Sequence, residues 1–294
     1  MAHDCLMEIP FQRIAIIGLG LIGGSWGLAL KENAYDGLRI GCDRPETLAS
    51  ALAVGAIDHA QEDPLAAVSH ADLVILAAPV GVILNLIPRI KTALSRRVLV
   101  TDVGSTKVAI CKRARETFGD ATLFLGGHPL AGKERSGIEN AEAGLFRNSR
   151  YALVPQAAEN LEDPRVRAFF RLLISAGAQP LVTDALSHDR AVAYLSHLPQ
   201  LLSTTLAALL AEQYSQSALP LELAGTGLQD MTRLAESPYS VWRDICRTNL
   251  VNIQEAVDRL IEKLQGLRQR LSSDSLQSDF DQAGELRQEL REKM

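Results

Sequence analysis

The stretch Arg13-Ile-Ala-Ile-Ile-Gly-Leu-Gly-Leu-Ile-Gly-Gly-Ser25 determines how the first half of the chain folds. A short apolar run ends in three spaced glycines, Gly18, Gly20 and Gly23, and an apolar segment of helical character follows. In such a strand–turn–helix unit the first glycine permits a tight turn, and the second lets the backbone approach a pyrophosphate. The third glycine lets the helix pack close to the strand, and the helix N-terminus offers N–H groups to an anion. The stretch therefore predicts a dinucleotide-binding turn.

An acidic residue ends the next apolar run, Leu38-Arg-Ile-Gly-Cys-Asp43. Asp43 lies 25 positions after Gly18, close to the spacing of about 20 that suits a carboxylate on the ribose hydroxyls. Because such a carboxylate repels a 2′-phosphate, we expect NAD as the cofactor. Arg44 could hold that phosphate if Asp43 turned away, so NADP remains an alternative cofactor. A glycine-rich turn that binds no nucleotide is the other alternative. The residues expected to contact the cofactor are Gly18, Gly20, Leu21, Ile22, Gly23, Asp43, Arg44, Pro79 and Ser105.

The composition narrows the class of protein. The chain of 294 residues is 47% hydrophobic and 22% charged, which is typical of soluble globular proteins. A formal net charge of −5 gives no sign of a nucleic-acid-binding surface. No apolar run reaches the roughly 18 residues of a membrane span, and the N-terminus is too short and acidic for a signal peptide. The four scattered cysteines form no CxxC pair, so we expect no metal site or disulfide framework and a cytoplasmic location.

The order of strand-like and helical segments predicts two domains. Alternation up to residue 184 predicts a Rossmann-like α/β domain with a doubly wound parallel sheet. Its further strands are expected at 72–79, 97–103, 122–125, 151–155 and 179–183, and its helices at 21–33, 45–55, 80–93, 105–118 and 163–176. From residue 185 to 294 we expect an all-helical domain, with helices at 185–213, 220–236, 238–248 and 249–271 and a solvated helix in the last twenty residues. An apolar helical domain often buries its surface against a second copy, which favours a homodimer.

Three loops at the carboxyl ends of the expected strands carry polar residues, and ligands of open α/β sheets bind at such ends. They follow Pro79 and cover 102–107 and 126–132. His128 lies between glycines and a proline, where a neutral imidazole can accept a proton at physiological pH. Ser105 is expected to open a helix, so its hydroxyl could be an N-cap, could face the substrate, or both.

The helical part adds two polar signals. His197 and Gln200 are three residues apart on one face of a helix that Pro199 is expected to kink. Arg233 follows a glycine-rich turn, and arginine suits bidentate binding of a carboxylate. The alternatives are two buried polar residues satisfied locally and an arginine in an ordinary salt bridge. These residues together predict a nicotinamide-dependent oxidoreductase that acts on a small carboxylate.

The whole set of motifs resembles the prephenate/arogenate dehydrogenase family of tyrosine biosynthesis, from about Arg13 to about Leu271. The motifs are GLGLIGGS at 18–25, DVGSTK at 102–107, GGHPLAG at 126–132, SHLPQ at 196–200, GTGLQDMTR at 225–233 and SPYSVWRD at 237–244. The resemblance implies oxidative decarboxylation of a cyclohexadienol, in which a hydride passes to the nicotinamide and the ring becomes aromatic. It also implies a homodimer joined through the helical domain.

The same resemblance implies the roles of individual residues. His128 would accept a hydrogen bond from the ring hydroxyl as that group becomes a carbonyl. Ser105 would orient the hydroxyl, the histidine and the nicotinamide, and Arg233 would bind a substrate carboxylate. The further substrate contacts that we expect are Ser196, His197, Gln200 and Thr226.

One departure from the family pattern bears on the substrate. Many members have a second histidine where this chain has Gln200, and glutamine is always neutral. Prephenate ends in a pyruvyl group, whereas arogenate carries an ammonium group, which a neutral residue penalises less than a cationic one. We therefore expect arogenate as the preferred or a shared substrate.

Two other classes of protein remain as alternatives. β-Hydroxyacid dehydrogenases share this layout but use a catalytic lysine in the helical domain, and residues 185–260 contain no lysine. A non-catalytic sensor of nicotinamide nucleotides would keep the glycine turn and Asp43 without needing His128, Ser105 and Arg233.

Overall fold

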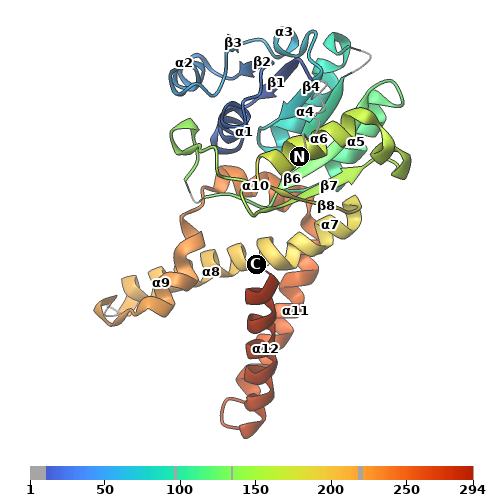
Figure 1. Cartoon of the computed structure of the whole chain (residues 1–294). Helices are drawn as coiled ribbons and strands as arrows, with labels where there is room; N and C mark the ends of the chain where they lie inside the picture. The colour runs from blue at the N-terminus through green and yellow to red at the C-terminus, as the bar shows by residue number, and fades with distance from the viewer. Residues whose placement is uncertain (1–10, 96–97, 134, 218–220, 294) are drawn as a thin grey trace, which may run out of the picture.

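The computed structural model describes residues 11–95, 98–133, 135–217 and 221–293. Residues 1–10, which informed the expectation of no signal peptide, lie outside this range, as does Arg97 of the predicted strand 97–103. The first part of the chain forms an eight-stranded sheet in the order β3-β2-β1-β4-β5-β6-β7-β8 (Figure 1). The strands are β1 (Arg13–Ile17), β2 (Leu38–Cys42), β3 (His59–Gln61), β4 (Leu73–Leu76), β5 (Leu99–Asp102), β6 (Leu123–Pro129), β7 (Arg150–Pro155) and β8 (Gln179–Val182). The predicted Rossmann-like class is confirmed.

Three details of the sheet differ from the prediction. β6 and β7 pair antiparallel, whereas the other strand pairs of the described sheet are parallel. The described residues between β6 and β7 form a loop with a short 3-10 turn and no crossover helix, and the chain returns in the opposite direction. β6 also continues past the expected end at 125 to Pro129, because His128 pairs with Ala152 of β7. β3 was not predicted, since three exposed residues, His59-Ala-Gln61, show no strand pattern.

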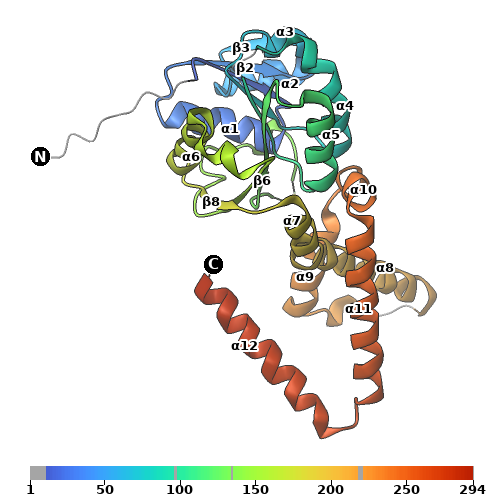
Figure 2. The same cartoon turned by 90° about the vertical axis from the view of Figure 1, so that its right-hand side faces the viewer.

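Helices cover both faces of the sheet (Figure 2). They are α1 (Leu21–Glu32), α2 (Pro45–Val54), α3 (Pro64–Val68), α4 (Val80–Ile90), α5 (Val108–Phe118) and α6 (Pro164–Ser175). Along β1, Ile14 and Ile16 enter the core beneath α1 and α6, while Ala15 and Ile17 enter the core beneath α3, α4 and α5. Because both faces are buried, such strands appear in the sequence as continuous apolar runs. The five-residue helix α3 was not predicted.

Helix α5 begins at Val108 and not at Ser105, which corrects the expected start of the helix and excludes the N-cap among the roles left open for Ser105. Lys107 occupies the N-cap position without a side-chain hydrogen bond of its own to the helix. A carboxylate from far along the chain takes that place: Asp189 accepts hydrogen bonds from the N–H groups of Lys107 (2.7 Å) and Val108 (2.9 Å). Ser105 is therefore released from the capping role that its residue type suggested.

The second part of the chain is helical, as predicted. Its elements are α7 (Ala185–Val192), a π-helical turn η4 (Ala193–His197), α8 (Leu198–Ser217), η5 (Leu221–Leu223), α9 (Thr226–Thr232), η6 (Arg233–Glu236), α10 (Tyr239–Thr248), α11 (Leu250–Gln269), η7 (Asp274–Leu276) and α12 (Gln277–Lys293). The π turn interrupts the expected helix 185–213 just before Pro199, which has no N–H to continue the regular ladder. The expected helix 220–236 is divided into α9 and η6, and residue 220 lies outside the described range.

The domain boundary predicted at residue 184 stays a prediction. Thr183 and Asp184 lie between β8 and α7. Helix α11 extends away from the sheet, and the exposed helix α12 turns back towards it (Figure 2). No helix in the described parts of the chain is both long and apolar enough to cross a membrane.

Carboxylates from the helical part cap two helices of the sheet part. Besides Asp189 on α5, Asp244 of α10 accepts a hydrogen bond from the N–H of Gly81 (3.0 Å) at the start of α4. Negative charge is favoured at a helix N-terminus, where N–H groups lack partners within the helix. Since α4 and α5 begin where β4 and β5 end, these contacts hold α7 and α10 against the carboxyl edge of the sheet (Figure 2).

Candidate active site

The glycine turn after β1 has the geometry that a pyrophosphate needs. Gly18 has a φ of +95°, and a Cβ there would run into the carbonyl of Ala77. A Cβ on Gly23 would strike the carbonyl oxygen of Gly18, so α1 packs against the turn too closely for any side chain. At Gly20, by contrast, a Cβ would meet nothing within 4 Å, and this N-cap of α1 makes no side-chain cap. The open space at the N-terminus of α1 fits the phosphates of NAD.

Asp43 lies beside this turn. Its Oδ2 accepts a hydrogen bond from the N–H of Leu19 (2.7 Å), within the glycine turn. The Arg44 side chain is 83% exposed, with its Nε 4.0 Å from Asp43 Oδ1. The carboxylate is thus held where the sequence predicts an acceptor for ribose hydroxyls, and the guanidinium lies at the solvent edge.

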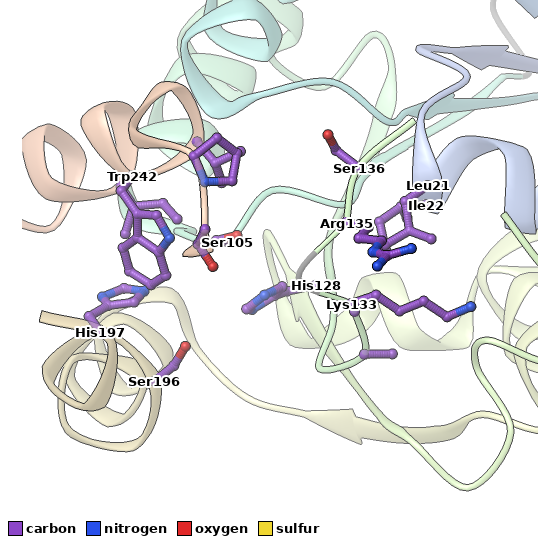
Figure 3. A pocket seen from close by; sticks show the side chains of 16 residues that line it. Leu21, Ile22, Ser105, His128, Lys133, Arg135, Ser136, Ser196, His197 and Trp242 are labelled. Carbon is purple, nitrogen blue, oxygen red and sulfur yellow. The ribbon is translucent and has the colours of Figure 1, made fainter. Parts of the chain in front are cut away.

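Three cavities adjoin one another between the sheet and the helical part. The first, the cofactor cleft, is lined by Gly20, Leu21, Ile22, Ala77, Ala78, Pro79, Val80, Val103, Gly104, Ser105, Val241 and Ile245. The second, the central cavity, has a volume of about 330 Å³ and contains Ser105, His128, Ser196, His197 and Trp242 in its wall (Figure 3). The third, the outer cavity, is lined by Gly132, Lys133, Leu195, Ser196, Pro199, Gln200, Arg233, Leu234, Ser237 and Trp242. The central cavity shares wall residues with each of the other two, so it lies between them.

His128 is held in place by a buried ion pair. Lys107 and Asp102 are both fully buried, and the Lys107 ammonium donates to the Asp102 carboxylate and to the carbonyl of Gly127. Asp102 also accepts a hydrogen bond from the N–H of Gly127 (3.0 Å), so both sides of that residue are fixed. Gly127 has no room for a side chain, because a Cβ would strike the carbonyl of Asp102. The motif 102–107 was identified from the sequence, but the ion pair between Lys107 and Asp102 was not predicted.

The environment of His128 favours its neutral form. The side chain is buried, and burial holds the pKa of His128 well below its usual range. The charges of His188, Lys107 and His197 act in the same direction. The imidazole at the wall of the central cavity is therefore a proton acceptor at physiological pH.

His197 faces the same cavity from the π turn, and its hydrogen-bond partner leaves it as a donor. Its Nδ1 lies 3.2 Å from the side-chain nitrogen of Asn249, which also donates to the carbonyl of Asp189 (2.7 Å). Burial lowers the pKa of His197 to about 4, so the ring is neutral. With Nδ1 accepting from Asn249, Nε2 carries the proton and serves as a donor. The ring of Trp242 packs edge-on against it, with centroids 5.8 Å apart (Figure 3).

The structure brings together most, but not all, of the other predicted substrate contacts. Gln200 and Arg233 line the outer cavity, and Ser196 lines both the outer and the central cavity. The Gln200 amide donates to the carbonyl of Leu234 (2.7 Å), so this buried side chain is satisfied as well as lining the site. Thr226, at the start of α9, is exposed and lines none of the three cavities.

Comparison with known proteins agrees with this arrangement. The model described as "Prephenate dehydrogenase, nucleotide-binding domain" matches residues 26–180, and "Prephenate dehydrogenase, dimerization domain" matches residues 184–292. The chain belongs to the prephenate dehydrogenase family. This membership confirms the expected family, fold class and dehydrogenase class.

Individual members of the family cover nearly the whole chain. A prephenate dehydrogenase of Lactococcus lactis is 32% identical over 282 residues, 94% of this chain and 77% of the relative. The crystal structure of prephenate dehydrogenase from Aquifex aeolicus with hydroxyphenyl propionate and NAD+ has a TM-score of 0.86 and 26% identity, covering 95% of this chain and 98% of that one. The Synechocystis arogenate dehydrogenase structure has a TM-score of 0.78 and 29% identity, covering 95% and 99%.

Two glycine substitutions separate packing from cofactor binding. Gly23→Ala forces α1 away from the turn, and we expect the free energy of unfolding to fall by about 1–3 kcal/mol. The methyl group of Gly20→Ala meets no neighbour, so we expect the free energy of unfolding to change by no more than about 0.5 kcal/mol. We expect NAD binding to weaken at least about tenfold, since the methyl group fills the phosphate space. Urea unfolding without cofactor and fluorescence titration with NAD measure the two effects. An unchanged NAD affinity in Gly20→Ala would contradict the assignment of this turn.

Proposed function

We propose that this chain catalyses the NAD-dependent oxidative decarboxylation of arogenate, prephenate or both, giving tyrosine or 4-hydroxyphenylpyruvate. The observation that carries the proposal is the row of adjoining cavities that runs from the glycine turn, past Ser105 and the neutral His128, to Arg233. In this order the binding groups match the parts of the reactants: the nicotinamide lies in the cofactor cleft, the cyclohexadienol ring beside His128, and the side-chain carboxylate at Arg233.

The residues of the site account for the proton transfers of the reaction. When bound, NAD+ accepts the hydride from the ring carbon that carries the hydroxyl, while the C–C bond to the ring carboxylate breaks and releases carbon dioxide. His128 accepts the hydroxyl proton as the C–O bond gains double-bond character, and it returns that proton to the phenolate oxygen when the ring becomes aromatic. Ser105, shared by the cofactor cleft and the central cavity, orients the hydroxyl between His128 and the nicotinamide.

The far end of the substrate falls in the outer cavity. Arg233 binds the carboxylate of the pyruvyl or alanyl side chain, for which a guanidinium offers two parallel donors. His197 and Ser196 line the passage between the two cavities and offer further hydrogen bonds. Binding groups at both ends hold the ring in one orientation, which supplies much of the catalysis in a reaction driven by aromatisation.

A spectrophotometric assay with two substrates and two cofactors tests the proposed function. We expect NAD to be reduced with arogenate, prephenate or both, and we expect His128→Asn to lower kcat by about 10²–10⁴-fold, the usual value of a lost general base. Tight binding of NAD without reduction in the presence of either substrate would favour the nucleotide sensor over the enzyme.

We also propose that arogenate is the preferred or a shared substrate. The amide of Gln200 carries no charge where it lines the outer cavity, so it places no cation near the ammonium group of arogenate.

Gln200→His, which introduces a titratable cation, should lower the ratio of kcat/KM for arogenate to that for prephenate by about five- to tenfold at slightly acid pH, as expected for two like charges near a protein surface. The neutral control Gln200→Asn should leave the ratio unchanged. Steady-state kinetics with both substrates measures it, and a strong preference of the unmodified enzyme for prephenate would overturn the proposal.

We propose NAD rather than NADP as the working cofactor, because the Asp43 carboxylate is fixed beside the turn. Asp43→Ser should shift the ratio of kcat/KM values towards NADP by at least about tenfold, since it removes the charge that repels a 2′-phosphate. Glu46→Ser removes an equal charge from an exposed position on the next helix and serves as the control. If both variants shift the ratio equally, Asp43 has no specific role.

We further propose a cytoplasmic homodimer joined through the helical part. The dimerization-domain match covers that part, and large apolar side chains on it are exposed, including Leu209, Ile261, Leu264, Phe280 and Leu286. Cys42, Cys111 and Cys246 are free thiols, which suits a reducing compartment.

A further inference from the structure

Two side chains of helix α7, His188 and Asp189, form a hydrogen-bonded chain with His128. The Nδ1 atom of His188 lies 2.8 Å from Asp189 Oδ1, and the Nε2 atom of His188 lies 2.9 Å from Nδ1 of His128. All three side chains are buried, and the rings of His128 and His188 meet edge-on with centroids 5.1 Å apart. Neither His188 nor Asp189 lines the three cavities, so neither is placed to touch the substrate.

The capping contacts of Asp189 set the direction of these hydrogen bonds. Its two carboxylate oxygens already accept from the backbone N–H groups of Lys107 and Val108, which can only donate. The same carboxylate accepts from His188, which places the proton of that ring on Nδ1 and leaves Nε2 with a lone pair. His128 must then donate through its own Nδ1–H, so the ring nitrogen left for the central cavity, Nε2, carries a lone pair.

We propose that His188 and Asp189 are positioning residues that lock His128 in the tautomer able to accept a proton from the substrate. The inference rests on the proposed function for its effect on catalysis, but the tautomer itself is a property of the resting protein. A histidine in the other tautomer would present an N–H to the substrate hydroxyl and could not act as the base. In the serine protease triad, a substitution that leaves the histidine in the wrong tautomer costs kcat about 10⁴-fold.

The Asp189 carboxylate also bears on the product of proton transfer. Once His128 carries the substrate proton, its Nδ1–H still donates to His188, and the Asp189 carboxylate lies at the other end of that ring. Besides burial, the groups that lower the pKa of His128 are His188, His197 and the Lys107 ammonium, which is itself paired with Asp102. Lys133 and Arg135 also line the central cavity. All of these disfavour the imidazolium, whereas a carboxylate hydrogen-bonded to the far side of His188 favours a positive charge on the linked rings.

The tautomer is measured directly by long-range ¹H–¹⁵N NMR of histidine-labelled protein without ligands. The chain has six histidines, and the signals missing from His128→Gln assign the ring of interest. We expect the Nε2 of His128 to resonate as an unprotonated nitrogen and Nδ1 as a protonated one. Protonation of Nε2 in the resting protein would overturn the proposal whether or not the enzyme is active.

The variant His188→Phe tests the effect on catalysis, since it keeps a ring against His128 and leaves Asp189 on α5 but removes the acceptor. We expect the His128 signals to lose the single tautomer and kcat to fall by about 10²-fold or more, with the affinity for NAD and the KM for substrate changed less than about threefold because no cavity residue is lost. His188→Gln, whose carbonyl can accept from His128, should recover about tenfold of the lost kcat and restore the tautomer, a rescue that a purely structural role would not produce.

The matched control is His59→Phe, which changes an exposed histidine on β3 and should alter neither the His128 signals nor kcat. A fall in kcat for His188→Phe with the His128 tautomer unchanged would overturn the proposal, and so would a loss of NAD affinity that parallels the loss of kcat. If wild-type protein reduces no cofactor with either substrate, the proposed function fails, while the NMR result still decides whether the tautomer is locked.

Discussion

The contact on which the site depends is the carboxylate of Asp189 on the N-terminus of α5. Helix α5 starts at the carboxyl edge of the sheet, directly after the loop that carries Ser105, and Asp189 comes from a helix more than 80 positions later. A buried carboxylate without partners would cost several kcal/mol, but here backbone N–H groups and the positive end of a helix satisfy it. The contact therefore places α7, and with it His188 and the π turn, in a defined position against the sheet. Asp244 of α10, which caps α4, places α10 against the sheet in the same way.

The cations in the cavity walls of this site are Lys133, Arg135 and Arg233. At its centre, two neutral histidines face the same cavity, one held as an acceptor and the other as a donor by their respective partners. The buried Lys107 ammonium beneath the site is paired with Asp102. A buried pair of this kind contributes little to stability, and its value here is that it fixes the backbone on both sides of Gly127. In the function that we propose, the ring of the substrate meets these oriented dipoles, and Arg233 binds the carboxylate in the outer cavity.

The parts of the fold that were predicted correctly are those with a strong local pattern. Continuous apolar runs mark β1, β4 and β5, and the three glycines mark the turn, because each requires particular residue types at adjacent positions. Three exposed residues of β3 show no such pattern, and the reversed direction of β7 depends on what connects it to β6. Of the roles left open for Ser105, the N-cap is excluded for a similar reason, since a carboxylate distant in sequence caps the helix instead. His188 and Asp189 follow each other in the sequence with no local sign of a role, since their function arises from contacts with other segments.

By itself, the sequence determined the dinucleotide turn, the acid after β2 and the change from alternating to helical segments, and it singled out His128 as the candidate base, since local sterics and residue chemistry decide each of them. Only the tertiary structure decided which nitrogen of His128 faces the central cavity and how Ser105, His128 and Arg233 come to line adjoining cavities. The physical reason is that a tautomer and a domain orientation depend on hydrogen bonds between groups far apart in the chain. Those partners can be identified only when folding has brought them to within about 3 Å of each other.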